Sequence, residues 1–506
     1  MVSAQHHGTI ADEEKPCLLE NLLKESDVRV VLADPPKNER GYNLTYPSLA
    51  LTHLIGYARD YFAEAEHSFH YLEGFCNIKE HLAALRELKP DFYGTTVAAI
   101  TSELAYQTIK AVRREHPALP IVCGGPHPTA MPEDVLASSS ADVCVRGEGE
   151  ITFVELLEHF SGQGKELSEI KGIAYRDQNG GTVLTAKRPY IKQLDALPFP
   201  AWDLVKDFSA YSGMHFRRAS PQSYVLCSRG CPFDCNFCSN PVWKENKPWV
   251  RLRGPEKIAQ EVEWLYRLGV REIYLGADEF NVSEAWAEEV CDRIAALDCR
   301  NNLYFHIDAR ADKMTPRLAQ KLAGINVWLA HLGIETGSQR TLDGIGKKVT
   351  LEQITEACRM MRSAGISVFG FIMLFHAWED KESNLCWETA ADVDRTISFA
   401  KNLFREGLIQ YCSWQVATPW PGSRLWQTAL RHNLIADRTA YHGIRTMAMN
   451  LPGVSEADIR RAVRRGVWLK TFHALKAGNL NWSETWRRGI ESVKNMAGIG
   501  TLGGTR

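Results

Sequence analysis

The sequence lacks any apolar run that approaches the roughly 20 residues needed to cross a bilayer. Its start, MVSAQHHGTIADEEKP, also lacks the charged and apolar regions of a secretory signal. An excess of either charge is missing as well, because 59 basic residues face 61 acidic ones and leave a net charge of -2. These absences argue against a membrane span and give no reason to expect a nucleic-acid partner. We therefore expect a cytoplasmic protein.

Most of the cysteines are not arranged in pairs along the sequence. Their number, 13, is odd, and nine of them are scattered along the chain: Cys17, Cys76, Cys123, Cys144, Cys291, Cys299, Cys358, Cys386 and Cys412. Scattered thiols suit a reducing compartment, where most of them serve as small buried apolar groups. The remaining four lie together in LCSRGCPFDCNFCSNP, residues 226–241. This cluster is the strongest chemical signal in the sequence.

The first part of the chain alternates between strand and helix patterns. At 506 residues, with 45% hydrophobic and 24% charged residues, the protein is globular and too long for a single core. Short apolar runs predict five strands, at residues 28–33, 67–74, 92–97, 121–124 and 143–146. Amphipathic stretches between them predict helices, including 78–88, 103–115 and 150–160. The alternation predicts an α/β fold with a parallel sheet, and ligands on such sheets bind at the carboxyl ends of the strands.

A second region of alternation follows a short break. A hairpin is predicted around NGG at residues 179–181, and the proline-rich LDALPFPAWDL is predicted to be an extended linker. From Ser223 about six strand and helix pairs follow, which a parallel barrel accommodates. We divide the chain into a leader at 1–27, a Rossmann-like (flavodoxin-like) domain at 28–162, a hairpin and linker at 163–220, a partial (β/α)6 TIM-type barrel at 221–430 and a helical region at 431–506.

The cysteine cluster points to an iron–sulfur site. Cys231, Cys235 and Cys238 have the spacing CxxxCxxC on the loop after the first barrel strand. Three thiolates on one tight loop hold three irons of a cubane cluster and leave the fourth iron open. The alternative is a structural zinc site completed by Cys227, but zinc sites of that kind normally use two separated pairs of ligands. We therefore favour the cluster and interpret Cys227 as a strand-end residue.

The segment SRGCPFDCNFCSNP resembles the motif of the radical S-adenosylmethionine superfamily, in the version found in members that also bind cobalamin. The resemblance implies a [4Fe-4S] cluster whose unique iron is chelated by the amino and carboxylate groups of S-adenosylmethionine. It implies reductive cleavage of that molecule to a 5'-deoxyadenosyl radical. It also implies a small-molecule substrate and an electron donor such as flavodoxin or ferredoxin.

Further contacts to S-adenosylmethionine follow from the same resemblance. Asp278 or Glu279, in GADEF after the second barrel strand, is a candidate acceptor for the methionine amino group. Arg310, in HIDAR after the third strand, is a candidate partner of the methionine carboxylate, and a surface arginine is the competing interpretation. Glu335, in LGIETGSQRTLDGIGK, is a stronger candidate, and Phe237 within the motif is another.

The leading domain resembles the cobalamin-binding fold that is joined to this barrel in one branch of the superfamily. The residues that carry the resemblance are YPSLALTHLIGYA, CGGPHPTAMPEDVL and DVCVRGEGEITFVELL. The contacts it implies are Thr101, Ser102, Gly124, Gly125, His127, Gly147 and Glu148. The glycines would let the nucleotide tail approach the backbone. A nicotinamide cofactor is the alternative, but no GxGxxG opens the first helix.

The DxHxxG segment that supplies a histidine to cobalt in many cobalamin enzymes is absent. His70, in SFHYLEG, has no preceding Asp at the required place, so we interpret it as an ordinary strand histidine. His127 is a candidate for contact with the corrin rim rather than with the metal. The lower face of cobalt would then carry water, no ligand or another side chain.

The combined resemblance implies a cobalamin-dependent methyltransferase. It would transfer a methyl group from methylcobalamin to an unactivated carbon or phosphorus of a small molecule, after the deoxyadenosyl radical has abstracted a hydrogen atom. One alternative keeps both cofactors but performs oxidation or ring formation, as in anaerobic porphyrin cyclases. Another is a cobalamin or redox sensor with a vestigial cluster. For His376, Trp378 and Glu379, after the fifth barrel strand, we favour a structural role over substrate contact.

Overall fold

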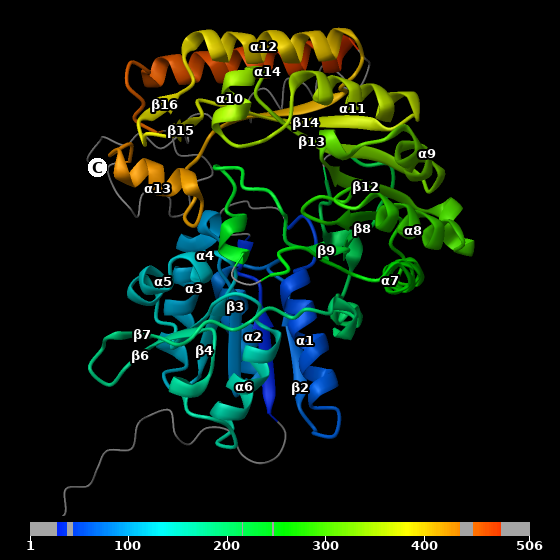
Figure 1. Ribbon diagram of the computed structural model, residues 1–506. Helices are drawn as coiled ribbons and strands as arrows, with labels where there is room; N and C mark the ends of the chain where they lie inside the picture. The colour runs from blue at the N-terminus through cyan, green and yellow to red at the C-terminus, as the bar shows by residue number, and fades with distance from the viewer. Residues whose placement is uncertain (1–27, 38–43, 215, 245–246, 436–448, 477–506) are drawn as a thin grey trace, which may run out of the picture.

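The structure is a computed structural model that describes residues 28–37, 44–214, 216–244, 247–435 and 449–476. It contains two α/β units, drawn in blue to cyan and in green to orange in Figure 1. The fold class predicted from the sequence is confirmed. Within the described residues, no helix is both long and apolar enough to cross a membrane.

The N-terminal unit is built on a seven-stranded sheet with the order β2-β1-β3-β4-β5-β6-β7. Five strands are parallel: β1 (Arg29–Ala33), β2 (Ser68–Leu72), β3 (Phe92–Thr96), β4 (Ile121–Gly124) and β5 (Val143–Val145). The helices are α1 (Leu49–Tyr61), α2 (Ile78–Leu88), α3 (Ser102–Glu115), α4 (Pro126–Ala130), α5 (Pro132–Ser138) and α6 (Glu150–Phe160). The middle of β1 is apolar without alternation and fully buried, as expected for a parallel strand covered on both faces.

The predicted hairpin extends this same sheet. Its strands β6 (Ile173–Arg176) and β7 (Thr182–Leu184) are antiparallel, and β6 pairs with β5. The hairpin therefore packs as part of the N-terminal unit, and the chain crosses to the second unit only after it.

The second unit is a six-stranded parallel sheet with the order β8-β11-β12-β13-β14-β17. Its strands are β8 (Gln222–Leu226), β11 (Glu272–Gly276), β12 (Tyr304–Ala309), β13 (Val327–Glu335), β14 (Ser367–Leu374) and β17 (Tyr411–Val416). Its helices are α7 (Pro255–Arg267), α8 (Glu284–Ala295), α9 (Pro316–Gly324), α10 (Gln339–Gly344), α11 (Leu351–Ser363) and α12 (Ala390–Arg405). The described strands β8 and β17 do not pair with each other, so the barrel is open, as the sequence predicts.

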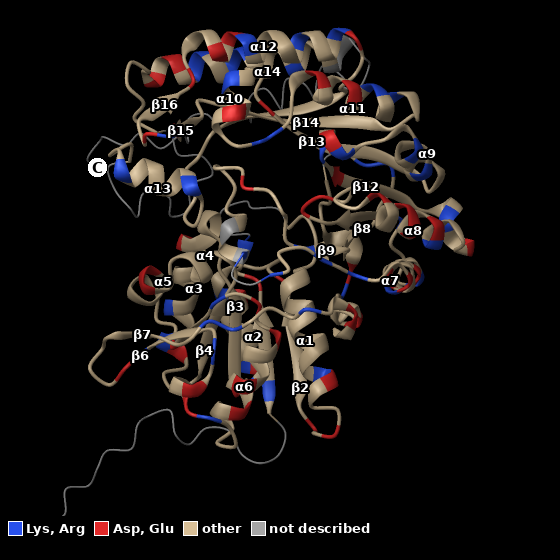
Figure 2. Cartoon of the chain, in the orientation of Figure 1, with Lys and Arg blue, Asp and Glu red and all other residues tan. Residues whose placement is uncertain are grey.

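Shorter elements complete the second unit. They are the pair β9 (Ser228–Arg229) and β10 (Arg251–Leu252), the pair β15 (Ala377–Glu379) and β16 (Leu385–Trp387), α13 (Arg424–Arg431) and α14 (Glu456–Lys476). The helix α14 lies beside α12 and is the described part of the expected C-terminal helical region (Figure 1). Charged residues of both signs are spread over the outer helices (Figure 2).

Candidate active site

The cysteine motif lies on a loop that begins directly after β9. Gly230 starts this loop with a φ of 86°, and an added Cβ there would lie 1.8 Å from the carbonyl oxygen of Trp249, so only glycine fits. Asn236 anchors the loop to the barrel. Its backbone N–H donates to the carbonyl of Ile345 at 2.9 Å, and its side chain donates to the carbonyl of Ala377 at 2.7 Å.

Burial raises the pKa of all four thiols of this segment, and Cys227 differs from the other three in its hydrogen bond to the strand. Burial raises the pKa of Cys231 to about 12 and that of Cys238 to about 11, and it also raises the pKa of Cys235. Cys227 is fully buried and its thiol donates to the carbonyl of Val225 at 3.5 Å. This supports the interpretation of Cys227 as a strand-end residue.

The donor set fits an iron–sulfur cluster. Cys231, Cys235 and Cys238 lie on one short loop and together offer three soft thiolate ligands. Three spaced soft ligands suit a cluster of several irons. Because the thiols are protonated without metal, binding of iron displaces their protons.

A buried arginine lies against this loop. Arg310 follows β12 and is 2% exposed, so it is not a surface arginine. Its guanidinium carbon lies 3.5 Å from the centre of the Phe233 ring, and Nε lies 2.5 Å from Oδ1 of Asp312. Its Nη1 lies 3.7 Å from Oε1 of Glu279.

Two atoms of this arginine–glutamate pair have no hydrogen-bond partner among the described residues. They are Nη1 of Arg310 and Oε2 of Glu279, and both are buried. Burial raises the pKa of Glu279 to about 7. Buried polar atoms normally find a partner, so a donor and an acceptor are missing here. The amino and carboxylate groups of S-adenosylmethionine supply that combination, and the predicted residues Arg310 and Glu279 therefore fit this ligand.

Glu335 and Lys347 form a second charged pair beside the loop. Glu335 ends β13 with a φ of 62°, which is strained for a residue other than glycine, and its Oε1 lies 2.9 Å from Nζ of Lys347. A Cβ on Gly333 would lie 2.4 Å from Oε1 of Glu335, so a side chain there would displace this ion pair. Lys347, which closes the GIGK segment, was not among the residues predicted from the sequence. Its ammonium group lies 6.0 Å from the Phe237 ring and lowers the pKa of Cys235 against the effect of burial.

The carboxyl ends of the N-terminal strands face the barrel across a cavity of about 400 Å³. Four of the predicted cobalamin contacts line it: Gly124, Gly125, Gly147 and Glu148. From the second unit, Asn240 and the predicted contact Asp278 line it. The side-chain nitrogen of Asn240 lies 3.3 Å from Oδ2 of Asp278. The cavity therefore joins the two predicted cofactor sites.

The glycines open this cavity to a ligand. An added Cβ on Gly124 would meet only Val145, at 3.7 Å, so a side chain there would project into free space. Gly125 has a φ of 112°, and its Cβ would lie 2.9 Å from the carbonyl oxygen of Val97. The backbone at these positions lies where a large cofactor can approach it closely.

Glu148 has a structural role as well. Its carboxylate accepts from Arg251 at 2.7 Å, from Arg229 at 3.3 Å and from the backbone of Ile191 at 2.9 Å. Although burial alone would raise the pKa of Glu148, these bonds and charges hold it below its ordinary value. Arg229 also pairs with Glu150. These ion pairs, which are largely buried, connect the N-terminal unit with the strands β9 and β10.

Three predicted cobalamin contacts are placed elsewhere. His127 is buried, with its ring 2.8 Å from the hydroxyl of Tyr106 and 3.5 Å from Asp134. The hydroxyl of Thr101 donates to its own turn at 3.3 Å, and that of Ser102 does so at 2.8 Å. None of the three lines the cavity, so they stay predictions without geometric support. His70 lies on the edge strand β2, also outside the cavity lining.

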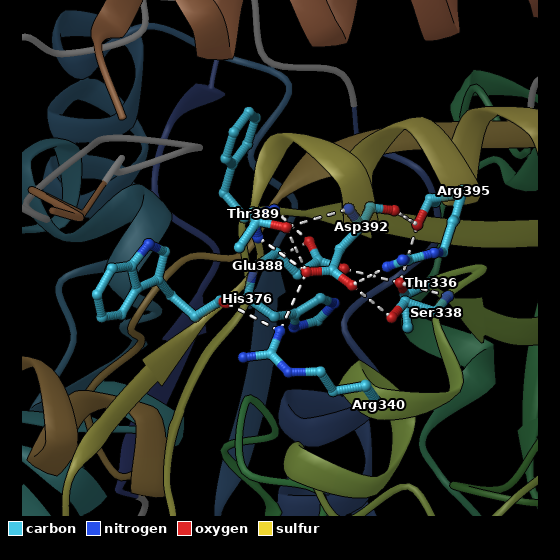
Figure 3. Close-up of polar contacts among 11 residues, drawn as sticks. Thr336, Ser338, Arg340, His376, Glu388, Thr389, Asp392 and Arg395 are labelled. Carbon is cyan, nitrogen blue, oxygen red and sulfur yellow. Dashed lines mark hydrogen bonds and ion pairs between the residues drawn. The ribbon is translucent and has the colours of Figure 1, made fainter. Parts of the chain in front are cut away.

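A polar network that the sequence analysis missed holds the wall beside the cysteine loop (Figure 3). Glu388 accepts from the hydroxyl of Thr336 at 2.7 Å and from the backbone of Phe375 and His376 at 2.7 and 3.2 Å. Phe375 has a φ of 64°, so Glu388 stabilises a strained turn. Asp392, which forms the capping box of α12 with the N-cap residue Thr389, adds bonds to Ser338, Arg340 and Arg395.

The residues expected at the barrel mouth belong to this wall. His376 is fully buried, and its ring lies 5.7 Å from that of Phe237. Trp378 is buried, and a Cβ on Gly344 would lie 2.2 Å from its ring. Glu379 pairs with Arg431 at 2.5 Å and with His432 at 2.9 Å. This agrees with the structural role that we favoured.

The Glu388 carboxyl predicts a pH dependence of stability. Burial raises its pKa from an ordinary 4.5 to about 7, so the folded state binds a proton between these values that the unfolded state releases. The free energy of unfolding is therefore expected to fall as the pH rises through this window. The fall should reach up to about 3 kcal/mol, because each unit of the pKa difference corresponds to about 1.4 kcal/mol. Glu388→Gln removes this dependence, and its melting temperature should fall less than that of the wild type between pH 5 and pH 8.

Thermal unfolding followed by circular dichroism measures this difference. Glu382→Gln, on an exposed turn, is the matched control and should behave as the wild type does. An equal fall in Glu388→Gln and wild type would contradict the assignment.

Comparison with known proteins supports both units. Residues 45–157 match the family model of the B12 binding domain, and residues 225–385 match that of the Radical SAM superfamily. An uncharacterized methyltransferase from Pyrococcus horikoshii is 30% identical over 419 residues, which cover 81% of this chain and 84% of that protein. The chain belongs to the cobalamin-dependent radical S-adenosylmethionine enzymes. The predicted [4Fe-4S] cluster, S-adenosylmethionine and cobalamin are the cofactors of this enzyme family.

Other members of this family are more distant. The anaerobic magnesium-protoporphyrin IX monomethyl ester cyclase from Cereibacter sphaeroides is 26% identical over 82% of this chain and 66% of its own length. The structure of the cobalamin-dependent S-adenosylmethionine radical enzyme OxsB, with aqua-cobalamin and S-adenosylmethionine bound, has a TM-score of 0.71 at 17% identity and covers 93% of this chain and 71% of that one. At this identity, the likeness to OxsB shows the fold.

Proposed function

We propose that this enzyme is a methyltransferase that adds a methyl group to an unactivated carbon or phosphorus of a small molecule. The observation that carries the proposal is the shared cavity, where Gly124 and Gly147 of one unit face Asn240 and Asp278 of the other. A substrate between the two cofactor sites would be within reach of both. The similarity to the Pyrococcus methyltransferase supports the same conclusion.

The residues have separable roles in this proposal. When bound, the cofactors supply a deoxyadenosyl radical for hydrogen abstraction and a methyl group for transfer. Cys231, Cys235 and Cys238 hold the cluster. Arg310 and Glu279 bind and orient the amino-acid part of S-adenosylmethionine. The ion pairs of Glu148 keep the two units closed around the cavity and limit the access of water.

The electron donor and the location are part of the proposal. A flavodoxin or ferredoxin would reduce the cluster, as the family resemblance implies. A cytoplasmic location agrees with the twelve described cysteines, none of which forms a disulfide.

Oxidation or ring formation is the second candidate, because the cyclase from Cereibacter covers a similar share of this chain. The cyclase is less identical to this chain than the Pyrococcus methyltransferase is, and a smaller share of its own length is covered. Both comparisons favour methyl transfer. A sensor with a vestigial cluster is a third candidate, against which the intact motif argues.

Anaerobic reconstitution distinguishes these candidates. The protein is loaded with iron, sulfide and hydroxocobalamin, then mixed with reductant and S-adenosylmethionine labelled in its methyl group. We expect both S-adenosylhomocysteine and deoxyadenosine by mass spectrometry, and protein without reductant is the control. Deoxyadenosine alone would contradict methyl transfer and support the second candidate. The absence of both products would support the sensor.

A further inference from the structure

The inside of the barrel carries polar residues that the cofactor sites do not use. On β11 and β12, the alternate residues Ile273, Leu275, Phe305 and Ile307 are fully buried in the apolar core. Because side chains alternate along a strand, the residues between them face the opposite side, which is the barrel interior. These inward residues include Tyr274, His306 and Asp308, and His331 on β13 is paired with Asp308 in register. Barrel interiors of this type are usually filled with branched apolar side chains.

Asp308 is the centre of this inner cluster. The hydroxyl of Tyr274 donates to its Oδ2, and Nδ1 of His331 lies 3.1 Å from its Oδ1. The ring of Tyr274 stacks on that of His306 at 4.6 Å. Tyr46, from the N-terminal unit, places its hydroxyl 3.4 Å from Nε2 of His306. The cluster is therefore held rigidly by contacts from several elements.

Of the inner polar groups, the Asp308 carboxylate is accessible. Its side chain is 32% exposed, whereas that of His331 is 1% exposed and His306 is 0% exposed. Phe369 and Phe371 lie 5.6 and 5.8 Å from the ring of His331. The carboxylate thus lies open to solvent beside an aromatic wall.

This accessible carboxylate is adjacent to the cofactor cavity. The ring of Tyr224, which lines the cavity, lies 4.9 Å from that of Tyr274. The backbone carbonyl of Asp308 accepts from Phe280 at 2.9 Å, just after the Asp278 loop. A molecule bound at Asp308 would therefore reach toward the space that the two cofactor sites share.

The charges around Asp308 select against anions. Asp278 lies near enough to contribute to the same negative field. The nearby cations are committed elsewhere, since Arg310 is assigned to Asp312, Glu279 and the methionine carboxylate of S-adenosylmethionine, and Lys347 contacts Glu335. A phosphate or carboxylate at this place would be repelled, whereas an amine or hydroxyl would be attracted.

Two ring nitrogens also lack partners within the described chain. They are Nδ1 of His306 and Nε2 of His331, both buried. Each requires a polar partner from outside the protein, such as an ordered water or a ligand group. They indicate that the inner cluster is completed by something the chain does not provide.

We propose that Asp308 is the substrate anchor, which accepts a hydrogen bond from an amine or hydroxyl group on a neutral or cationic substrate with a flat apolar body. Tyr274 and His331 are positioning residues that orient its carboxylate. This proposal rests on the proposed function in treating the bound molecule as the substrate. It deepens that function by excluding anionic substrates, and therefore by favouring carbon over a phosphinate phosphorus as the methyl acceptor.

Three probes with the same phenyl ring test the anchor. They are phenethylamine, which ends in an ammonium group, 2-phenylethanol, which ends in a hydroxyl, and phenylacetate, which ends in a carboxylate and has no other polar group. Binding to the reconstituted holoenzyme is measured by equilibrium dialysis with mass spectrometry. We expect phenethylamine and 2-phenylethanol to bind at least about tenfold more tightly than phenylacetate, the factor expected for one hydrogen bond to a charged group.

Variants then assign the preference to Asp308. Asp308→Asn should weaken the binding of phenethylamine about tenfold and reduce its advantage over the carboxylate probe. Tyr274→Phe, which keeps the ring but loses the bond to Asp308, should give a smaller change in the same direction. Asp292→Asn makes the same change in charge on α8, where the side chain is 63% exposed, and should leave all three affinities unchanged. The cobalamin content of each variant reports whether it has folded.

Equal affinities for the three probes would contradict the assignment of Asp308 as the substrate anchor. So would an order of affinities that is unchanged in Asp308→Asn. Failure of the proposed function would look different. If the probe ranking holds but reconstitution yields no S-adenosylhomocysteine, the methyltransferase proposal fails and Asp308 remains a binding residue.

Discussion

Replacing Cys231, Cys235 or Cys238 by alanine is expected to abolish the iron–sulfur cluster. Bound iron after anaerobic reconstitution should fall from about four atoms per chain to less than about one, because two thiolates on one loop do not retain a cubane. Deoxyadenosine formation should fall by more than about a thousandfold, since it requires electrons from the cluster. Iron analysis and mass spectrometry of the reaction products measure the two effects.

Cys227 is the matched control because it lies in the same short segment. It is fully buried with its thiol bonded to Val225, so Cys227→Ala should keep its iron and its cleavage activity. The small cavity left by this substitution should lower the free energy of unfolding by only about 1–2 kcal/mol. Iron retained by the three motif variants, or zinc found in the wild type after anaerobic purification, would contradict the cluster assignment.

Gly124→Leu is expected to block cobalamin. The added Cβ meets only Val145, at 3.7 Å, so the fold should tolerate the change, but the rest of the side chain enters the cavity. Affinity for hydroxocobalamin should fall at least about fivefold, because overfilling a packed site costs about 1–3 kcal/mol. The absorbance of cobalamin that elutes with the protein in gel filtration measures the loss.

The control for this variant is Gly324→Leu, at the end of α9. An added Cβ there has no neighbour within 4 Å and the position is exposed, so cobalamin binding should not change. Iron content should stay the same in both variants, since the cysteine loop lies in the other unit. A Gly124→Leu protein that binds cobalamin as the wild type does would place the cofactor elsewhere.

Local signals explain why much of the fold was predictable. The helix at 78–88 has the predicted bounds. Asn77 and Glu80 form a capping box at its start, and Lys89, in the left-handed conformation, ends it. The pairing of β6 with β5 was not predictable in the same way. It depends on contacts between segments about thirty residues apart, which no local pattern encodes.

The same distinction between local signals and contacts over long sequence separations applies to the candidate site. The cysteine spacing is local, so the cluster loop could be proposed from sequence alone. Lys347 and Glu388 were missed because their roles depend on distant partners, Glu335 and Thr336, and each looks like an ordinary surface charge in the sequence. His127 was selected for its place in a loop motif, but its side chain lies inside the domain against Tyr106.

The ion pairs between Glu148, Glu150, Arg229 and Arg251 have a consequence for how this enzyme can be dissected. Separating the units would break these ion pairs, which are largely buried in the intact chain, and would expose the apolar lining of the cavity to water. Neither half should behave as a well-formed fragment. We therefore expect that the corrin module and the barrel have to be expressed and engineered as one piece.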